Sequence, residues 1–262
     1  MRKIARPKIL GAAVVNTTSQ RISADGLFDC LFSTYSKGAI DKFRAFLSLH
    51  PFVTKWLIAC DFVINEAEAT NDAYVYTFFP HNEEIIDRKD KIKKLVPRDF
   101  KKTKEVTSEL NDFFHSGETF SICLLTPKKF KPAGDIHVVR GSLDETLRNM
   151  RNWQDADTDK QKKVIKAFER LREKANANNF NAELMSTMMV ATVLAAFCAF
   201  ILAKERKTEI VGWFPDRDNI TTAYERIADL MFAVSFSAFF ARGTGLTSVR
   251  PRLQLGFPTP IR

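Results

Sequence analysis

Three aspartates stand where they could take part in chemistry. Asp61 lies inside the apolar run KWLIACDFVI at residues 55–64, where a carboxylate is costly unless it is paired, bound to a metal or facing a cleft. Asp216 and Asp218 follow the apolar segment EIVGWF at residues 209–214. Ligands and catalytic groups of α/β sheets gather beyond the carboxyl ends of strands. The three acids are therefore candidate catalytic residues, and Asp218 has a second interpretation as the cap of the helix that follows.

Paired carboxylates at such a site would hold a divalent cation. Mg²⁺ and Mn²⁺ prefer oxygen ligands and can stabilise both the attacking and the leaving oxygen in phosphodiester cleavage. Asp61 and Asp216 are the predicted metal ligands, with Mg²⁺ as the predicted cofactor. The distance between these two carboxylates decides the prediction, because a single ion cannot join them directly across more than about 10 Å.

The elements that must position these acids mix strand and helix patterns. Apolar runs rich in strand formers predict strands at residues 9–15, 55–64, 74–79, 119–125, 136–139 and 209–214. The second and third of these are separated by the polar segment NEAEATND and are expected to form an antiparallel hairpin. Helical spacing predicts two short helices over 27–47 and further helices at 82–95, 107–114, from Ser142 onward, 157–175, 184–203 and 219–242.

This order of elements predicts one α/β domain over residues 1–262, with a mixed sheet flanked by helices. Residues 142–176 are expected to form an inserted helical hairpin, because Ser142 and Glu145 have the spacing of a capping box. Residues 243–262 are rich in Pro and Gly and basic, and predict an extended C-terminal arm.

The run from Leu184 to Ala203 contains no charged residue, and it has two interpretations. It is long enough to span a bilayer, and basic residues follow its C-terminal end. However, it is rich in small residues, no Trp or Tyr lies at either end, and a helix buried on all sides in an α/β core is equally apolar. We expect a buried helix, with a membrane-anchored effector as the alternative.

The net charge of +9 is concentrated, and it predicts a polyanionic partner. Residues 88–104 read RKDKIKKLVPRDFKKTK, although a solvated helix and loop would read the same way. Lys and Arg contacts to phosphate carry most non-specific affinity for nucleic acid, and an acidic protein or an anionic lipid surface would also be attracted. No aromatic-interleaved motif accompanies the run. The candidate nucleic-acid contacts are Arg88, Lys89, Lys91, Lys93, Lys94, Arg98, Lys101, Lys102, Lys104, Lys128 and Lys129.

Other motifs are missing or weak. The four cysteines are far apart without zinc-ligand spacing, and this pattern favours reduced thiols in a cytoplasmic protein. The sequence contains no GxxxxGK[ST] loop, no GxGxxG after a strand and no GxSxG elbow. Phe is abundant, at 23 residues against four Tyr, so most aromatic rings are expected to fill the core.

The arrangement resembles the RNase H-like nuclease superfamily, in which an Asp-bearing strand opens a hairpin and a later helix-strand-Asp-helix unit completes a metal site. The matching segments are LIACDFVI, AYVYTFF and AAFCAFILAKERKTEIVGWFPDRDN. The chain departs from the family because Phe62 and Val63 follow Asp61 directly, and because only Glu66 or Glu118 could serve as a middle carboxylate. The resemblance implies an RNase H-like fold, and the departures are those of a degenerate member that binds without cutting.

Three functions remain open. The first is a nucleic-acid-associated protein that hydrolyses phosphodiesters with Mg²⁺. The second is a non-catalytic subunit whose Phe-rich surface and basic residues serve as a scaffold in a larger nucleoprotein or defence assembly, with protein partners. The third is the membrane-anchored effector. The sequence does not separate DNA from RNA, and it does not give an oligomeric state.

Overall fold

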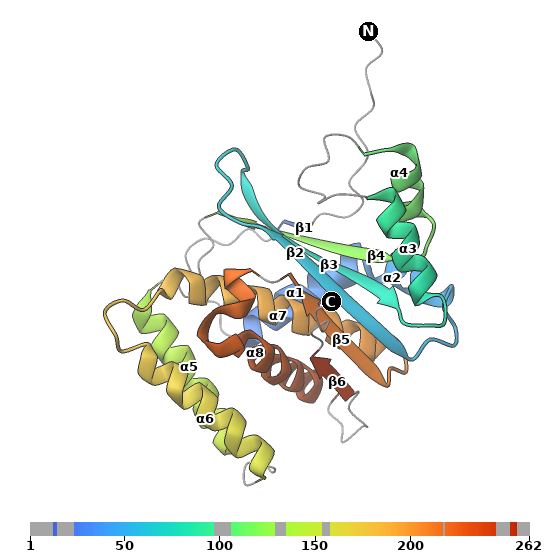
Figure 1. Ribbon diagram of the computed structural model, residues 1–262. Coiled ribbons are helices and arrows are strands. Elements are labelled where there is room, and N and C mark those ends of the chain that lie inside the picture. The colour runs from blue at the N-terminus through green and yellow to red at the C-terminus, as the bar shows by residue number, and fades with distance from the viewer. Residues whose placement is uncertain are drawn as a thin grey trace. The chain divides into compact units, whose positions relative to one another are not determined.

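A computed structural model of the chain describes residues 13–14, 24–96, 106–128, 135–153, 158–216, 218–244 and 252–255 (Figure 1). The chain divides into two compact units. Unit 1 comprises residues 1–53 and 61–128, and unit 2 comprises residues 54–60 and 129–262. Strand β2 (Lys55–Val63) contributes to both, because its residues 55–60 belong to unit 2 and its residues 61–63 to unit 1. The single domain expected from the sequence stays a prediction.

Unit 1 contains a mixed sheet. Strand β3 (Asn71–Pro80) pairs antiparallel with β4 (Phe120–Pro127), and β1 (Ala13–Val14) pairs parallel with β4. Alternate residues of β3 are buried, as expected for a strand with one covered face. The helices of this unit are α1 (Ala24–Gly38), α2 (Ile40–Ser48), α3 (Ile85–Leu95) and α4 (Ser108–His115).

The core of unit 1 is aromatic. Phe43 of α2 is fully buried, and its ring centroid lies 4.9 Å from that of Phe78 in β3 and 5.3 Å from that of Phe120 in β4. Phe46, the next turn of α2, also packs on Phe120, with ring centroids 5.5 Å apart. Such large apolar rings bury 150–250 Å² each, so they dominate the stability of this unit, at about 25 cal/mol per Å².

In its described residues, unit 2 combines parallel strands with helices. Residues 55–60 of β2 pair parallel with β5 (Ile210–Pro215), and β6 (Arg252–Leu255) pairs parallel with the same strand. The predicted C-terminal arm therefore contributes a short strand. The helices are α5 (Ile136–Arg151), α6 (Asp159–Lys174), α7 (Ala182–Glu205) and α8 (Asn219–Thr244).

The uncharged run forms α7, whose N-terminus is capped by Asn181. The helix packs along α8, where Phe197 and Phe200 meet Phe239 with ring centroids 6.2 and 6.4 Å apart. By length and composition α7 could cross a membrane, but 72% of its most apolar stretch is buried inside the protein. This burial agrees with the interpretation of α7 as a core helix.

One predicted strand is wrong. Residues 136–139 begin helix α5, because the Asp135 side chain accepts a hydrogen bond from the His137 amide and caps the helix there. The capping-box spacing of Ser142 and Glu145 therefore lies inside a helix that has already begun, and the helical hairpin starts earlier than the predicted residue 142. The α/β class and the mixed sheet are confirmed, whereas the RNase H-like assignment stays a prediction.

Candidate nucleic-acid interface

The three candidate catalytic acids are solvent-facing or structural. Asp61 occupies an exposed position of β2, so the burial cost expected from its apolar surroundings does not arise. Its Oδ1 accepts a hydrogen bond from the Phe62 amide at 2.9 Å. Asp216, directly after β5, is exposed. Asp218 caps α8, since its Oδ1 accepts from the Thr221 amide at 3.0 Å.

A metal site at these acids stays a prediction. Within the described residues, no group of three or more His, Cys, Asp or Glu side chains is placed to hold an ion. Asp61 belongs to unit 1, and Asp216 and Asp218 belong to unit 2. If Mg²⁺ binds, the oxygens of Asp61 and Asp216 are the ligands that would hold it.

The buried carboxylate of the hairpin is Asp72, which the sequence analysis did not single out. Asp72 is only 4% exposed, and its Oδ1 accepts from the Asn65 amide at 2.9 Å. Asn65 has a φ of 60°, so the carboxylate holds a left-handed turn between β2 and β3. Burial, together with the charge of Asp72, raises the pKa of Tyr74. The sequence signal was available, because Asp72 and Tyr74 fall on one face of an alternating strand.

Arg88 does not belong to the exposed basic surface that the sequence predicts. It is 4% exposed, and its guanidinium donates to the carbonyl of Pro80 at 3.0 Å. Glu118 lies 3.5 Å from the same guanidinium and also pairs with Lys91. Arg88 therefore ties α3 to the end of β3 and to the segment before β4.

Lys128 has a structural role too, because its ammonium donates to the backbone carbonyls of Glu66 and Ala67 in the β2–β3 loop. Lys89, Lys93 and Lys94 are exposed along α3, as predicted for contacts with a polyanion. The remaining candidates lie outside the described residues: Arg98, Lys101, Lys102, Lys104 and Lys129.

A second basic surface lies on α6, a helix that the sequence predicted at residues 157–175 without a functional role. Lys163, Lys166 and Arg170 are exposed and are spaced by three and four residues, so they form one row along the helix, here called the basic row. The opposite face is buried through Phe168 and Leu171. The spacing of the row is readable from the sequence once the apolar face is identified.

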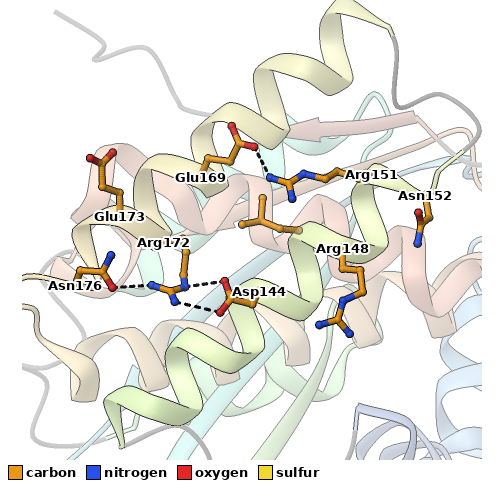
Figure 2. A pocket seen from close by; sticks show the side chains of 9 residues that line it. Asp144, Arg148, Arg151, Asn152, Glu169, Arg172, Glu173 and Asn176 are labelled. Carbon is orange, nitrogen blue, oxygen red and sulfur yellow. Dashed lines mark hydrogen bonds and ion pairs between the residues drawn. The ribbon is translucent and has the colours of Figure 1, made fainter.

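Two ion pairs join helices α5 and α6 (Figure 2). Arg172 donates to both carboxylate oxygens of Asp144, at 2.8 and 3.1 Å, and Arg151 pairs with Glu169 at 2.6 Å. Between the pairs lies an open hollow of roughly 760 Å³ with the side chain of Leu147 among its lining. Both pairs are largely solvent-exposed, so their value lies more in fixing the hairpin geometry than in stability.

Arg148 at the end of this hollow is different. It is exposed, and Figure 2 shows its guanidinium directed away from α6 and from both ion pairs. In the described part of the chain it forms no hydrogen bond or ion pair, so its planar fork of donors is open to a phosphate.

Comparisons of the chain with models of protein families, with curated proteins and with solved structures found no match. The site therefore has to be interpreted from its own chemistry. What the fold defines is an α/β protein that presents basic helical surfaces, one on each unit.

Proposed function

We propose that the protein is a nucleic-acid-associated binding subunit that acts without catalysis, and the observation that carries the proposal is the basic row on α6. The row presents three cationic side chains on one face of a helix, with about 5–6 Å between the Cβ atoms of neighbouring turns. Such a row can follow a phosphate backbone, because phosphate contacts depend on position and charge and need no base-specific geometry.

The distribution of charge supports the same function. Helices α5 and α6 together hold ten Lys or Arg and five Asp or Glu, a net +5 out of +9 for the whole chain. These two helices make up 32 of 262 residues. Charge concentrated in this way creates a local field that steers polyanions, whereas the same charge spread evenly would not.

The test is the salt dependence of binding, measured by fluorescence anisotropy on a labelled duplex. Three phosphate contacts contribute about 2.7 to the slope of log K against log salt concentration. The triple variant Lys163→Ala, Lys166→Ala, Arg170→Ala is expected to bind more weakly and to lose most of that slope.

A charge-matched control carries alanine at three exposed lysines elsewhere, Lys37, Lys55 and Lys207, and should keep the slope. Equal losses in the two triple variants would show that only averaged charge matters and would refute the row. The absence of any binding at about 50 mM salt, where phosphate-driven affinity is strong, would refute the function itself.

Metal-dependent hydrolysis is the competing proposal, and one feature favours testing it. The parallel ladder of β2 and β5 ends at the pair Cys60–Pro215, and each strand continues with an aspartate. Cleavage of labelled strands in Mg²⁺ or Mn²⁺ that is lost in both Asp61→Ala and Asp216→Ala would replace the binding function with an enzymatic one. We expect no such cleavage.

A further inference from the structure

Unit 1 exposes apolar side chains that a soluble surface normally covers. Among the residues whose exposure the structure describes, every strongly exposed large apolar side chain belongs to this unit. Phe52 is the extreme case, with 94% of the residue in contact with solvent. The full set is Leu49, Phe52, Val63, Ile86, Val106 and Phe114.

Three of these side chains belong to two segments that meet at Gly117, and are here called the apolar tip: Leu49 and Phe52 in the turn after α2, and Phe114 near the end of α4. The Leu49 side chain lies against Gly117, where an added Cβ would come within 2.6 Å of its Cδ1. Gly117 has a φ of 78°, so the backbone at this position favours glycine. Phe114 precedes Gly117 by three residues.

The tip is held on rigid supports. His50, between Leu49 and Phe52, hydrogen-bonds through Nε2 to the Gly117 carbonyl at 3.0 Å. Its ring packs on Phe46, a core residue, with centroids 5.1 Å apart. These contacts fix the backbone that carries the exposed rings. Binding of a partner would therefore not include the entropic cost of ordering this loop.

Exposed lysines lie on the helices that lead to the tip. Lys42 is exposed on the row of α2 that leads to Leu49. Lys91 of α3 lies over the ring of Phe113, 5.4 Å from its centroid, and Phe113 is the sequence neighbour of Phe114. Lys94, one turn further along the same face of α3, is exposed. The fold thus brings a lysine of α3 against an aromatic residue of α4 that lies far from it in the sequence.

We propose that the apolar tip is a binding site for single-stranded nucleic acid, in which bases stack on Phe52 and Phe114 while phosphates contact Lys42 and Lys94. The inference rests on the proposed function and names its ligand class. Exposed aromatic rings beside cations are the usual means of binding single strands, because every base has a face that can stack. A base paired inside a duplex offers no such face.

The exposed lysines favour this occupant over the others. A second copy of the chain would bring the same lysines against the same surface. A lipid bilayer covers a wide area and would have to accommodate the exposed acids Glu109 and Asp112 of α4, whereas a single strand covers a narrow one. Both alternatives are outcomes of the test below.

The experiment compares two labelled strands of about twelve nucleotides, a length within the range of single-strand sites. One is oligothymidine, and the other has the same phosphates and sugars but no bases. The full chain should bind oligothymidine more tightly. Phe52→Ser should weaken that binding by roughly ten- to a hundred-fold, from the stacking of one or two bases, and should leave the abasic strand unaffected.

Two further variants sharpen the result. Phe52→Trp keeps a stacking surface, so it should retain the affinity and lose indole fluorescence when oligothymidine binds. Val63→Ser removes another exposed apolar side chain of unit 1 and should change nothing.

The inference fails if Phe52→Ser binds oligothymidine as tightly as the parent. It also fails if that substitution instead abolishes self-association in sedimentation, or binding to vesicles that contain phosphatidylserine. If the abasic strand and duplex bind normally while the bases add nothing, the proposed function stands and only the stacking site is lost. If no nucleic acid binds at all, both are refuted.

Discussion

At the scale of single residues, the buried arginine of α3 separates structural from functional charge. Arg88→Met should lower the free energy of unfolding by about 2 kcal/mol, because the Pro80 carbonyl loses its buried donor and Glu118 loses one of its two cations. Urea denaturation followed by circular dichroism measures the change. Lys89→Met, one residue away and exposed, should stay within about 0.5 kcal/mol. If Arg88→Met left the free energy of unfolding unchanged, the Arg88 guanidinium would be solvated in the folded protein.

The acids after β5 should differ in the same measurement. Asp218→Ala removes the cap of α8 and is expected to cost about 1 kcal/mol of stability. Asp216→Ala removes an exposed side chain and should cost less than about 0.5 kcal/mol. If Asp216 proved the more destabilising of the two, the assignment of the cap would be wrong.

A half-buried acid on α8 makes stability depend on pH. Burial raises the pKa of Asp229, and the ion pair with Arg226 at 2.8 Å lowers it only in part. A carboxyl whose pKa is higher in the folded state loses stability as the pH rises from the unfolded pKa, near 4, through the folded value. The Asp229→Asn variant has no titrating carboxyl at this position, so it does not lose stability in this way as the pH rises. The stability of the variant relative to the parent should therefore be higher at pH 7 than at pH 4, in thermal melts at both pH values.

The same residues show what sequence reasoning can reach. Asp218 was open to interpretation as a cap from its place before a helical pattern. The exposure of Asp61 was readable from the alternation in KWLIACDFVI, in which Trp56, Ile58 and Cys60 take the buried face. Arg88 could not be placed, because its partners Pro80 and Glu118 meet it only through the fold.

At the scale of elements, the most unusual geometry is the break inside α8. Tyr224, Glu225 and Arg226 all have positive φ between 51° and 65°, which costs a non-glycine residue roughly 1–2 kcal/mol each. The Tyr224 ring stacks on Phe180 at 5.0 Å, and the Glu225 carboxylate pairs with Lys174. Contacts with neighbouring elements therefore hold a turn that the local sequence disfavours.

Glu225→Gly should stabilise the protein by about 0.5–1 kcal/mol, because glycine adopts this conformation without strain and the exposed ion pair with Lys174 contributes little. Glu225→Ala is the matched control, since it removes the same ion pair but keeps the Cβ, and it should not stabilise. The midpoint of thermal unfolding compares the three proteins. Equal midpoints for glycine and alanine would mean that the turn is not strained.

The elements also show where pattern reading succeeds. In α5 the β-branched residues near Val138 suggested a strand, yet Val139, Leu143, Leu147 and Met150 recur every three or four residues, and all are buried. The helical spacing of the apolar residues predicts the structure of this segment better than its β-branched residues do. The left-handed turn of α8 carries no glycine and no other local signal, so only tertiary contacts specify it.

At the scale of the whole molecule, the burial of α7 bears on the membrane-anchored alternative. With most of its apolar stretch buried against its own domain, α7 has little surface left for lipid. We therefore expect alkaline carbonate to release the expressed protein from the membrane fraction. Retention in the carbonate-washed pellet would revive the membrane-anchored alternative.

The distribution of surface types was only partly predictable. The net charge of +9 and the basic run at residues 88–104 were evident, but the basic row depends on which residues of α6 face inward. The apolar tip could not be foreseen, because Leu49 and Gly117 are far apart in the sequence and meet only in the folded unit.

The pairing of β2 with β5 has a consequence for how the protein is made. Thr54 and Glu209, which directly precede the first pair of this ladder and share a side-chain hydrogen bond, are 155 residues apart. At about 5–20 residues per second, the ribosome needs roughly ten to thirty seconds to deliver the second strand after the first. Trp56 and Ile58, fully buried in the finished protein, have no β5 to pair with during that time. During this interval the unpaired residues of β2 are accessible to chaperones, and they stay so until residue 215 has left the exit tunnel.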